Sequence, residues 1–245
     1  MVSRPMSNAS DRNRRYLPYV ILLGLIFVPI SVMIVAQIRH GQQTRELELG
    51  QQAFLQDVKR IGGHIVQTPA GPRDAFQPVI SVDLSGATID GDILNRLSEF
   101  TTIERLNLDG AVLEREDYRT LDHFPKLRNL SLNGSTFSDE DLPFESLQLT
   151  ALSLRSTAIT DDGLSRLTGM TSLANVDISD TAVTDEGLKS LSELTSLKTL
   201  ELDEDCITPD GVMALQSVKL LQVVRVHVAD GLGQQAKEFV RPLAA

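Results

Sequence analysis

From residue 82 onward, a short hydrophobic motif returns at nearly constant intervals along the chain. Two aliphatic residues flank one polar residue, and the motif begins at Val82, Leu106, Leu130, Leu152, Val176, Leu200 and Val224. The successive intervals are 24, 24, 22, 24, 24 and 24 residues. Apolar–polar alternation is typical of a β-strand with one buried face, so we expect one strand in each interval.

Between the strands, the hydrophobic residues change to helical spacing. One interval carries them at Leu164, Leu167, Met170 and Leu173. A strand and a short helix within each interval indicate a repeat architecture in which neighbouring units stack. The interval from Leu130 to Leu152 is two residues short and contains Pro143, so we expect a turn there in place of a full helix.

The residues that lead into these helices also repeat. Thr160 and Thr184 each precede an acidic pair, a glycine and a leucine, and Thr208 precedes the variant Pro-Asp-Gly-Val. We expect each threonine to cap a helix, with the acids near the positive end of the helix dipole. Just before each cap is a column of small residues: Ala87, Ala111, Ser135, Thr157 and Thr181.

Residues 79–228 therefore resemble the leucine-rich repeat family, in the Thr-Asp-x-Gly-Leu variant also seen in the cysteine-containing repeats of F-box partner proteins. Ser, Thr or Ala replaces the Cys or Asn of the family at the buried corner, except at Asp205. The resemblance implies an α/β fold: a right-handed solenoid with a parallel sheet on its concave face and helices outside. Many members bind proteins on that face, and few are enzymes.

Both ends of a solenoid need caps. Residues 39–81 are predicted to hold a juxtamembrane segment and an amino-terminal cap, with an amphipathic helix over about 43–61 that ends at Gly62-Gly63. The repeats are predicted over 82–228. Residues 229–245 are predicted to form a carboxy-terminal cap helix.

Residues 17–38 contain no charged side chain and, as a helix, would be about 33 Å long, enough to span a bilayer. A cleaved signal peptide is the alternative, but its apolar stretch is usually shorter. The tail over 1–16 has four arginines and one aspartate, which favours a cytoplasmic amino terminus and an extracytoplasmic repeat domain. The membrane is thus one expected partner.

Composition narrows the function. A net charge of -10 argues against nucleic-acid binding, which needs positive charge at the phosphates. The single cysteine, Cys206, excludes an internal disulfide, and we read it as incidental. The four histidines fall in unrelated segments, so we expect no catalytic triad, metal ion or cofactor. The acidic run around Asp203 suggests calcium, but a solvated surface is the preferred interpretation.

The residues beside the strand aliphatics should point out of the concave face. They include five carboxylates, three arginines and no aromatic residue, which predicts a polar, transient protein interface with Arg155 as its main anchor. The candidate partner-binding residues are Asp83, Arg105, Asn107, Asp109, Asn129, Asn133, Arg155, Asn175, Asp177, Glu201, Asp203, Arg225 and His227.

The sequence thus favours a single-pass, membrane-anchored, non-catalytic repeat module that binds a protein or envelope component. One alternative is an intracellular adapter of the F-box partner type, which would need the opposite topology. The other is a hydrolase that uses Asp177 and Glu201, which should lie in matching columns of neighbouring strands about 5 Å apart.

Overall fold

The computed structural model describes residues 42, 45, 49–68, 78–89, 91–142, 146–203, 208–216, 218–230 and 233–240, with backbone alone at 209, 212, 228–230 and 233–240. The chain divides into two units, Met1–Phe54 and Leu55–Ala245. The predicted tail (1–16) and membrane span (17–38) lie outside the described residues. Among the residues that are described, no helix has both the length and the apolar character to cross a membrane.

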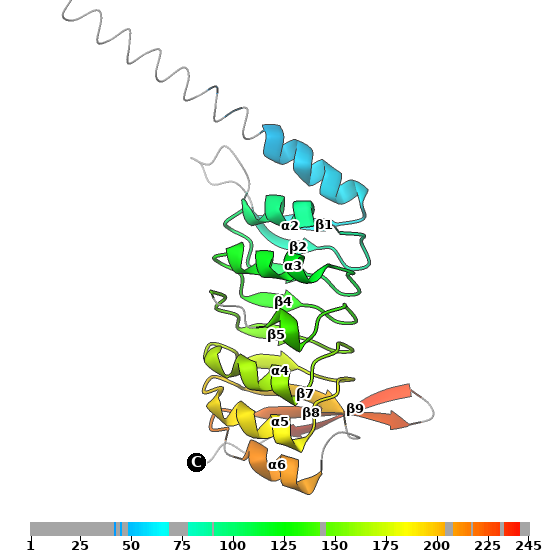
Figure 1. Ribbon diagram of the computed structural model, residues 1–245, viewed down its shortest axis with the longest axis vertical. Coiled ribbons are helices and arrows are strands. Elements are labelled where there is room, and N and C mark those ends of the chain that lie inside the picture. Colours follow the sequence, from blue (N-terminus) through cyan, green and yellow to red (C-terminus); the bar gives the residue numbers. More distant parts are fainter. Residues whose placement is uncertain are drawn as a thin grey trace, which may run out of the picture. The chain divides into compact units, whose positions relative to one another are not determined.

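The second unit is built on one sheet whose nine strands follow each other in chain order (Figure 1). Strands β2 to β8 are parallel, and β1 and β9 pair antiparallel at the two edges. The strands are β1 His64–Gln67, β2 Val79–Asp83, β3 Arg105–Asn107, β4 Asn129–Ser131, β5 Ala151–Ser153, β6 Asn175–Asp177, β7 Thr199–Asp203, β8 Val223–Asp230 and β9 Gly233–Val240.

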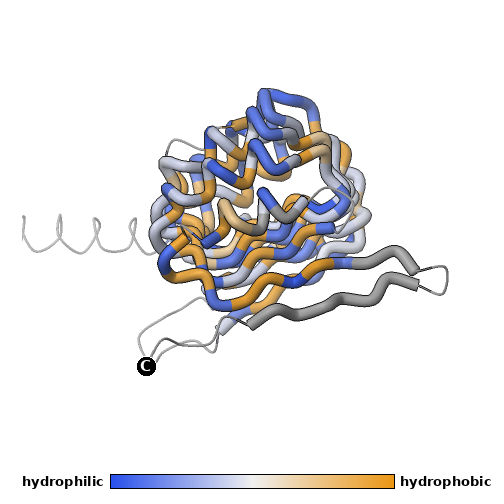
Figure 2. The backbone as a smooth tube through the Cα atoms, turned by 90° about the horizontal axis from the view of Figure 1, so that it is seen from below, coloured by the Kyte–Doolittle hydropathy of each residue, from blue (hydrophilic) through white to orange (hydrophobic). Residues whose placement is uncertain are grey.

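The register confirms the repeat period. The seven predicted motif starts lie side by side, each paired with the next: Val82, Leu106, Leu130, Leu152, Val176, Leu200 and Val224. The first six of these side chains are at most 2% exposed, so the aliphatic columns form the core. Seen along the stack, hydrophobic residues recur at corresponding places in successive turns (Figure 2).

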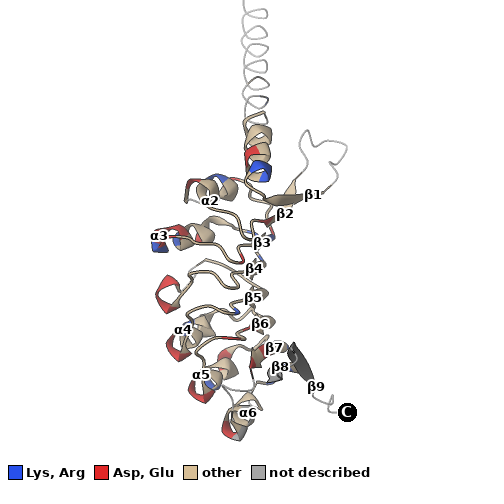
Figure 3. Ribbon diagram, turned by 90° about the vertical axis from the view of Figure 1, so that its right-hand side faces the viewer, with Lys and Arg blue, Asp and Glu red and all other residues tan. Residues whose placement is uncertain are grey.

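Short helical segments cover the other side of this core, and the sheet lies on the concave side of the second unit (Figure 3). These segments are α2 Gly91–Ser98, α3 Arg115–Tyr118, η1 Arg119–His123, η2 Asp139–Asp141, α4 Asp161–Arg166, η3 Leu167–Gly169, α5 Asp185–Ser190, η4 Leu191–Glu193 and α6 Pro209–Leu215. The three predicted threonine caps are confirmed, because the hydroxyls of Thr160, Thr184 and Thr208 each accept an N–H from the first helical turn.

At the amino-terminal end, residues 49–60 are helical, and Gly62 ends the helix with a φ of 95°. Leu55 and Val58 are buried, and the carbonyl of Val58 accepts the N–H of Gly63 at 2.9 Å. The predicted helix and its glycine stop are therefore confirmed over the described part.

The predicted carboxy-terminal helix over 229–245 is wrong. The chain forms an antiparallel hairpin in which β8 pairs with β9 from Val223↔Val240 to Asp230↔Gly233. Strand β8 would otherwise leave a row of backbone N–H and C=O groups unpaired at the end of the sheet. Closing the stack with a strand satisfies those groups, which a helix cannot do.

Polar contacts tie the repeats together where the helical segments begin. In the fourth to sixth repeats, the capping threonine donates its backbone N–H to the aspartate that starts the helical segment of the preceding repeat. These pairs are Asp139–Thr160 at 2.9 Å, Asp161–Thr184 at 2.7 Å and Asp185–Thr208 at 3.0 Å. Each threonine hydroxyl donates to the other oxygen of the same carboxylate.

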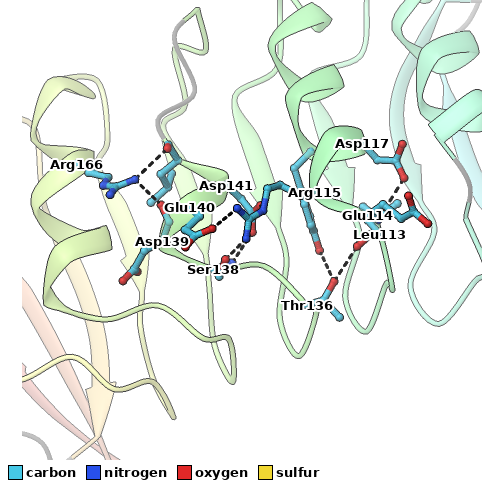
Figure 4. Close-up of polar contacts among 12 residues, drawn as sticks. Leu113, Glu114, Arg115, Asp117, Thr136, Ser138, Asp139, Glu140, Asp141 and Arg166 are labelled. Atoms are coloured by element: carbon cyan, nitrogen blue, oxygen red, sulfur yellow. Dashed lines mark hydrogen bonds and ion pairs between the residues drawn. The ribbon is translucent and has the colours of Figure 1, made fainter.

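In the second and third repeats, the carboxylate comes from within the same repeat. The N–H of Glu114 donates to Asp117 at 3.2 Å, and the N–H of Ser138 donates to Asp141 at 2.8 Å (Figure 4). Every described repeat from the second to the sixth thus satisfies its capping N–H with one carboxylate, supplied from either of two positions.

This exchange explains the glycine of the repeat motif. A Cβ atom on Gly163, Gly187 or Gly211 would lie 2.0–2.4 Å from the carboxylate oxygen of the preceding repeat, closer than any atoms can approach. At the first junction the roles are reversed, because the carboxylate belongs to the following repeat: a Cβ atom on Gly91 would lie 2.0 Å from an oxygen of Asp117. One carboxylate fits at each of these junctions, and the opposite position must stay empty.

The short third repeat forms a 3-10 turn, η2, in agreement with the expected turn. Arg166 of the next repeat donates to the carbonyl of Asp139 at 2.9 Å, and Arg115 of the preceding repeat forms an ion pair with Glu140 (Figure 4). Arginines from both neighbours therefore hold the turn in place of the contacts that a full helix would make.

Candidate partner-binding groove

The strands present three rows of side chains on the concave face. On strands β2 to β7, the first row precedes the inner aliphatic residue and comprises Ser81, Arg105, Asn129, Ala151, Asn175 and Thr199. The middle row follows that aliphatic residue and comprises Asp83, Asn107, Ser131, Ser153, Asp177 and Glu201. The third row is two residues further on and comprises Ser85, Asp109, Asn133, Arg155, Ser179 and Asp203.

An open groove of about 480 Å³ runs across β2 to β7. Its lining contains every residue of the first and middle rows and none of the third. The buried side chains Leu106, Leu130, Leu152 and Val176 form the rest of the lining. The groove therefore lies over the first two rows and not over the third.

The third row is largely engaged in hydrogen bonds that join the repeats. The Asp109 carboxylate accepts the Ser131 hydroxyl at 2.5 Å and the Asn133 N–H at 2.9 Å. The Asn133 side-chain oxygen accepts the Ser153 hydroxyl at 2.6 Å and the Arg155 N–H at 2.9 Å. Asp109 and Asn133 thus serve the neighbouring repeat.

The residue type in the middle row decides which side chain accepts the backbone N–H of the third-row residue. Asp83, Asn107 and Asp177 each accept the N–H two residues further along their own strand, at 2.9–3.0 Å. Where the middle row is Ser131 or Ser153, the preceding repeat supplies the oxygen, and the serine hydroxyl donates to that same side chain. This pattern gives the mixture of serine and acid along the strands a structural reason.

The structure separates the predicted partner-binding residues into two groups. Those that line the groove are Asp83, Arg105, Asn107, Asn129, Asn175, Asp177 and Glu201. Those outside its lining are Asp109, Asn133, Arg155, Asp203, Arg225 and His227. Arg155, the expected main anchor, is half-buried in the third row, and Arg105 is the arginine of the groove.

The candidates also omit several residues that line the groove: Ser81, Ser131, Ala151, Ser153 and Thr199. Their columns are visible in the sequence, because each occupies the same repeat position as a candidate. Small neutral side chains give a weaker indication of binding in a sequence than charged ones, so these five are not among the predicted residues.

The first row holds the exposed polar groups of the groove. Arg105, Asn129 and Asn175 are exposed. In the part of the chain that the structure describes, their side chains form no hydrogen bond or ion pair. They can therefore bind a partner without first breaking a contact within the protein.

The carboxy-terminal end of the groove carries a charged cluster. Glu201 pairs with Arg225 at 2.6 Å, and its second oxygen lies 3.4 Å from Nε2 of His227. Asp177 is in register with Glu201, as predicted for a hydrolytic pair. However, Asp177 accepts bonds from Ser153 at 3.2 Å and Ser179 at 3.0 Å, so both carboxylates already have partners.

The described residues contain no group of three or more His, Cys, Asp or Glu side chains placed to hold a metal ion. Residues Glu204, Asp205 and Cys206, in the acidic run considered for calcium, lie outside the described ranges. The arrangement on the concave face offers hydrogen bonding and charge to a bound partner.

A family model described as leucine-rich repeat matches residues 147–167 and 169–192. These two segments lie in the regular part of the stack, around β5, α4, β6 and α5. The sequence resemblance is supported there. A comparison with curated protein sequences gives no significant match.

Among solved structures, the chain is similar to an internalin C2 from Listeria monocytogenes. The sequences are 18% identical, and the match covers 66% of this chain and 80% of that one with a TM-score of 0.44.

Proposed function

We propose that the repeat unit is a non-catalytic binding module whose concave groove binds a protein partner. The observation that carries the proposal is the groove itself: a parallel sheet presents rows of side chains along it, and among these Arg105, Asn129 and Asn175 are exposed with unused polar groups. Binding sites that are built on regular elements need little reordering when a partner arrives.

The chemistry of the groove favours a polar and transient interaction. Its first and middle rows contain no aromatic residue, and Arg105 is their only arginine. Strong protein interfaces usually centre on aromatic or arginine anchors in desolvated pockets. An open groove with one such anchor is suited to a weak complex that forms and dissociates readily.

The enzyme alternative is less well supported. Glu201 is held by Arg225, and Asp177 accepts two hydrogen bonds, so neither carboxylate is set apart as a proton donor or nucleophile. Acid–base catalysis by two carboxylates usually requires environments that separate their roles.

We further propose that residues 17–38 anchor this module in a membrane, with the amino terminus in the cytoplasm. The support is the apolar run and the excess of arginine before it. A reporter enzyme that works only outside the cytoplasm, fused after Ala245, should be active. Activity of a cytoplasmic reporter at the same place would favour the intracellular adapter instead.

Charge reversal in the groove tests the binding proposal. The full chain is used to recover crosslinked partners from native membranes, and wild type is compared with Arg105→Glu, Arg155→Glu and Lys126→Glu. Lys126 is exposed and outside the groove, so its reversal is the matched control. We expect loss of a partner with Arg105→Glu and no loss with Lys126→Glu. Equal recovery with all variants would refute groove binding.

A further inference from the structure

Some charged side chains of the groove are not neutralised by an ion of opposite sign. Those of opposite charge are separated along the stack. Arg105 on β3 is exposed and forms no ion pair within the described residues. Asp177 on β6 accepts two neutral hydrogen bonds, and no cation pairs with it in the described part of the chain. Glu201 is neutralised by Arg225, and Asp83 lies beyond Arg105 on β2. A ligand that crosses the middle strands therefore meets a cation first and an anion second.

The spacing of these charges follows from the sheet. Neighbouring strands are about 4.8 Å apart, so the three steps from β3 to β6 cover about 14 Å. Asp177 is also one row further along its strand, which lengthens the separation to about 16 Å. An extended polypeptide advances about 3.3 Å per residue, so four or five residues cover the same distance.

The residues between these charges fit a polypeptide main chain. Asn129 and Asn175 each carry an amide NH2 group that donates and a carbonyl oxygen that accepts, which complement the C=O and N–H of a peptide group. Ala151 stands between them in the first row and is the smallest side chain there, which leaves room for a side chain of the ligand. Nucleobases stack on aromatic side chains, and neither row contains one.

We propose that the groove binds an extended polypeptide segment that crosses the strands and carries an acidic and a basic side chain four or five residues apart. The acidic side chain pairs with Arg105, the basic one faces Asp177, and the intervening main chain bonds to Asn129 and Asn175. This inference rests on the proposed function and specifies its ligand.

Synthetic peptides test the inference. The probes are fluorescent dodecapeptides of serine, alanine and threonine that carry one aspartate and one lysine about five positions apart. A matched peptide of the same composition has the two charges adjacent. Binding to the full chain is measured by fluorescence anisotropy at low salt. We expect the separated peptide to bind about tenfold more tightly than the matched one, because only its charges reach both partners.

Variants of the full chain locate the peptide. Arg105→Glu should remove the preference for the separated peptide, and it should bind a peptide with lysine at both positions more tightly than wild type does. A misfolded variant could not produce that gain. Asn175→Ala should weaken the separated peptide about fivefold, the effect of one hydrogen bond, and Lys126→Glu should change nothing.

Equal binding of the separated and adjacent peptides, or no binding by either up to about 1 mM, would overturn the inference. If Arg105→Glu still abolished partner recovery, the proposed function would stand with a different ligand. If recovery were also unchanged, both would fail.

Discussion

At the scale of single residues, the clearest constraint is one backbone conformation that each of the first five repeats adopts after its strand. Gly86, Gly110 and Gly134 adopt it in the first three repeats with φ of 62–67°, and Ser156 and Asp180 adopt it in the next two with φ of 56° and 55°. Residues with a Cβ atom are disfavoured in this left-handed region. The repeats therefore share a geometry that only some of them meet without strain.

Ser156→Gly should raise the free energy of unfolding by roughly 0.5–1 kcal/mol, because relief of strain exceeds the added entropy of glycine in the unfolded chain. The variant loses the bond from the Ser156 hydroxyl to Asp180, which is exposed and therefore weak. Urea denaturation of the full chain measures the change. The reciprocal Gly134→Ser should lower the free energy of unfolding. Losses in both variants would show that this backbone position does not limit stability.

A pH effect follows from one carboxylate of the repeat junctions. Bonds from the hydroxyl and then the N–H of Thr208 hold the pKa of the Asp185 carboxyl below its ordinary value of 3.8. A lowered pKa in the folded state stabilises the protein above pH 3.8, and this contribution is lost as the pH falls through the lowered value. Asp185→Asn should therefore be less stable than wild type at neutral pH.

The difference in unfolding free energy between the two proteins should narrow as the pH falls from 3.8 through the lowered pKa, where Asp185 of the folded wild type becomes protonated. Urea midpoints at a series of pH values measure it. A difference that stays constant from pH 7 to the acid limit would mean that the charge of Asp185 is irrelevant to the junction.

At the scale of elements, the capping N–H of each repeat from the second to the sixth is satisfied by one carboxylate, which either of two positions can supply. The fourth to sixth repeats take it from the preceding repeat, and the second and third use their own. The Thr-Asp-x-Gly motif is thus a contact between repeats as much as a helix start. Its aspartate serves the threonine of the next unit, and its glycine makes room for the aspartate of the unit before.

Moving the carboxylate from Asp161 to Gly187 tests whether either position can supply it. Asp161→Gly removes the acceptor of Thr184 and should cost about 1–2 kcal/mol. Gly187→Asp alone should also destabilise, because its Cβ would lie 2.4 Å from the Asp161 oxygen. The double variant restores one carboxylate and one empty position, the arrangement of Gly91 and Asp117.

We expect the double variant to be more stable than the sum of the single losses by at least about 1 kcal/mol, measured as a double-mutant cycle by urea unfolding. Simple additivity would show that the two positions act independently.

At the scale of the whole molecule, the strand register and the core could be predicted because the repeat period is almost constant. Any strand position then fixes its neighbours in the sheet. The hydrogen bonds between repeats could not be predicted, because the carboxylate for a capping N–H can come from the preceding repeat, as Asp139 does for Thr160, or from the same repeat, as Asp141 does for Ser138. Only the fold shows which source is used. The closing hairpin was missed because Ala236, Phe239 and Val240 fit helical spacing, whereas the need for a paired edge is a property of the assembled sheet.

The candidate site shows the same division. The concave columns followed from strand alternation, and seven of the thirteen candidates line the groove. The position of the groove along the strands could not be predicted. Asp109 and Asn133 form hydrogen bonds to the next repeat only where that repeat carries a serine in the middle row. Arg155, the predicted anchor, lies outside the groove lining, whereas Arg105 lies within it.

The central claim is that partners bind the groove over the first two rows. Site-specific photocrosslinking is the sharpest test of it. A photoreactive residue is placed in the full chain at Asn175 in the groove, at Arg155 in the third row, or at Ser165 on the outer face of α4, and adducts formed in native membranes are compared by mass. We expect a discrete protein adduct from position 175, with little or none from positions 155 and 165. An adduct that forms equally at all three positions, or only at position 165, would contradict it.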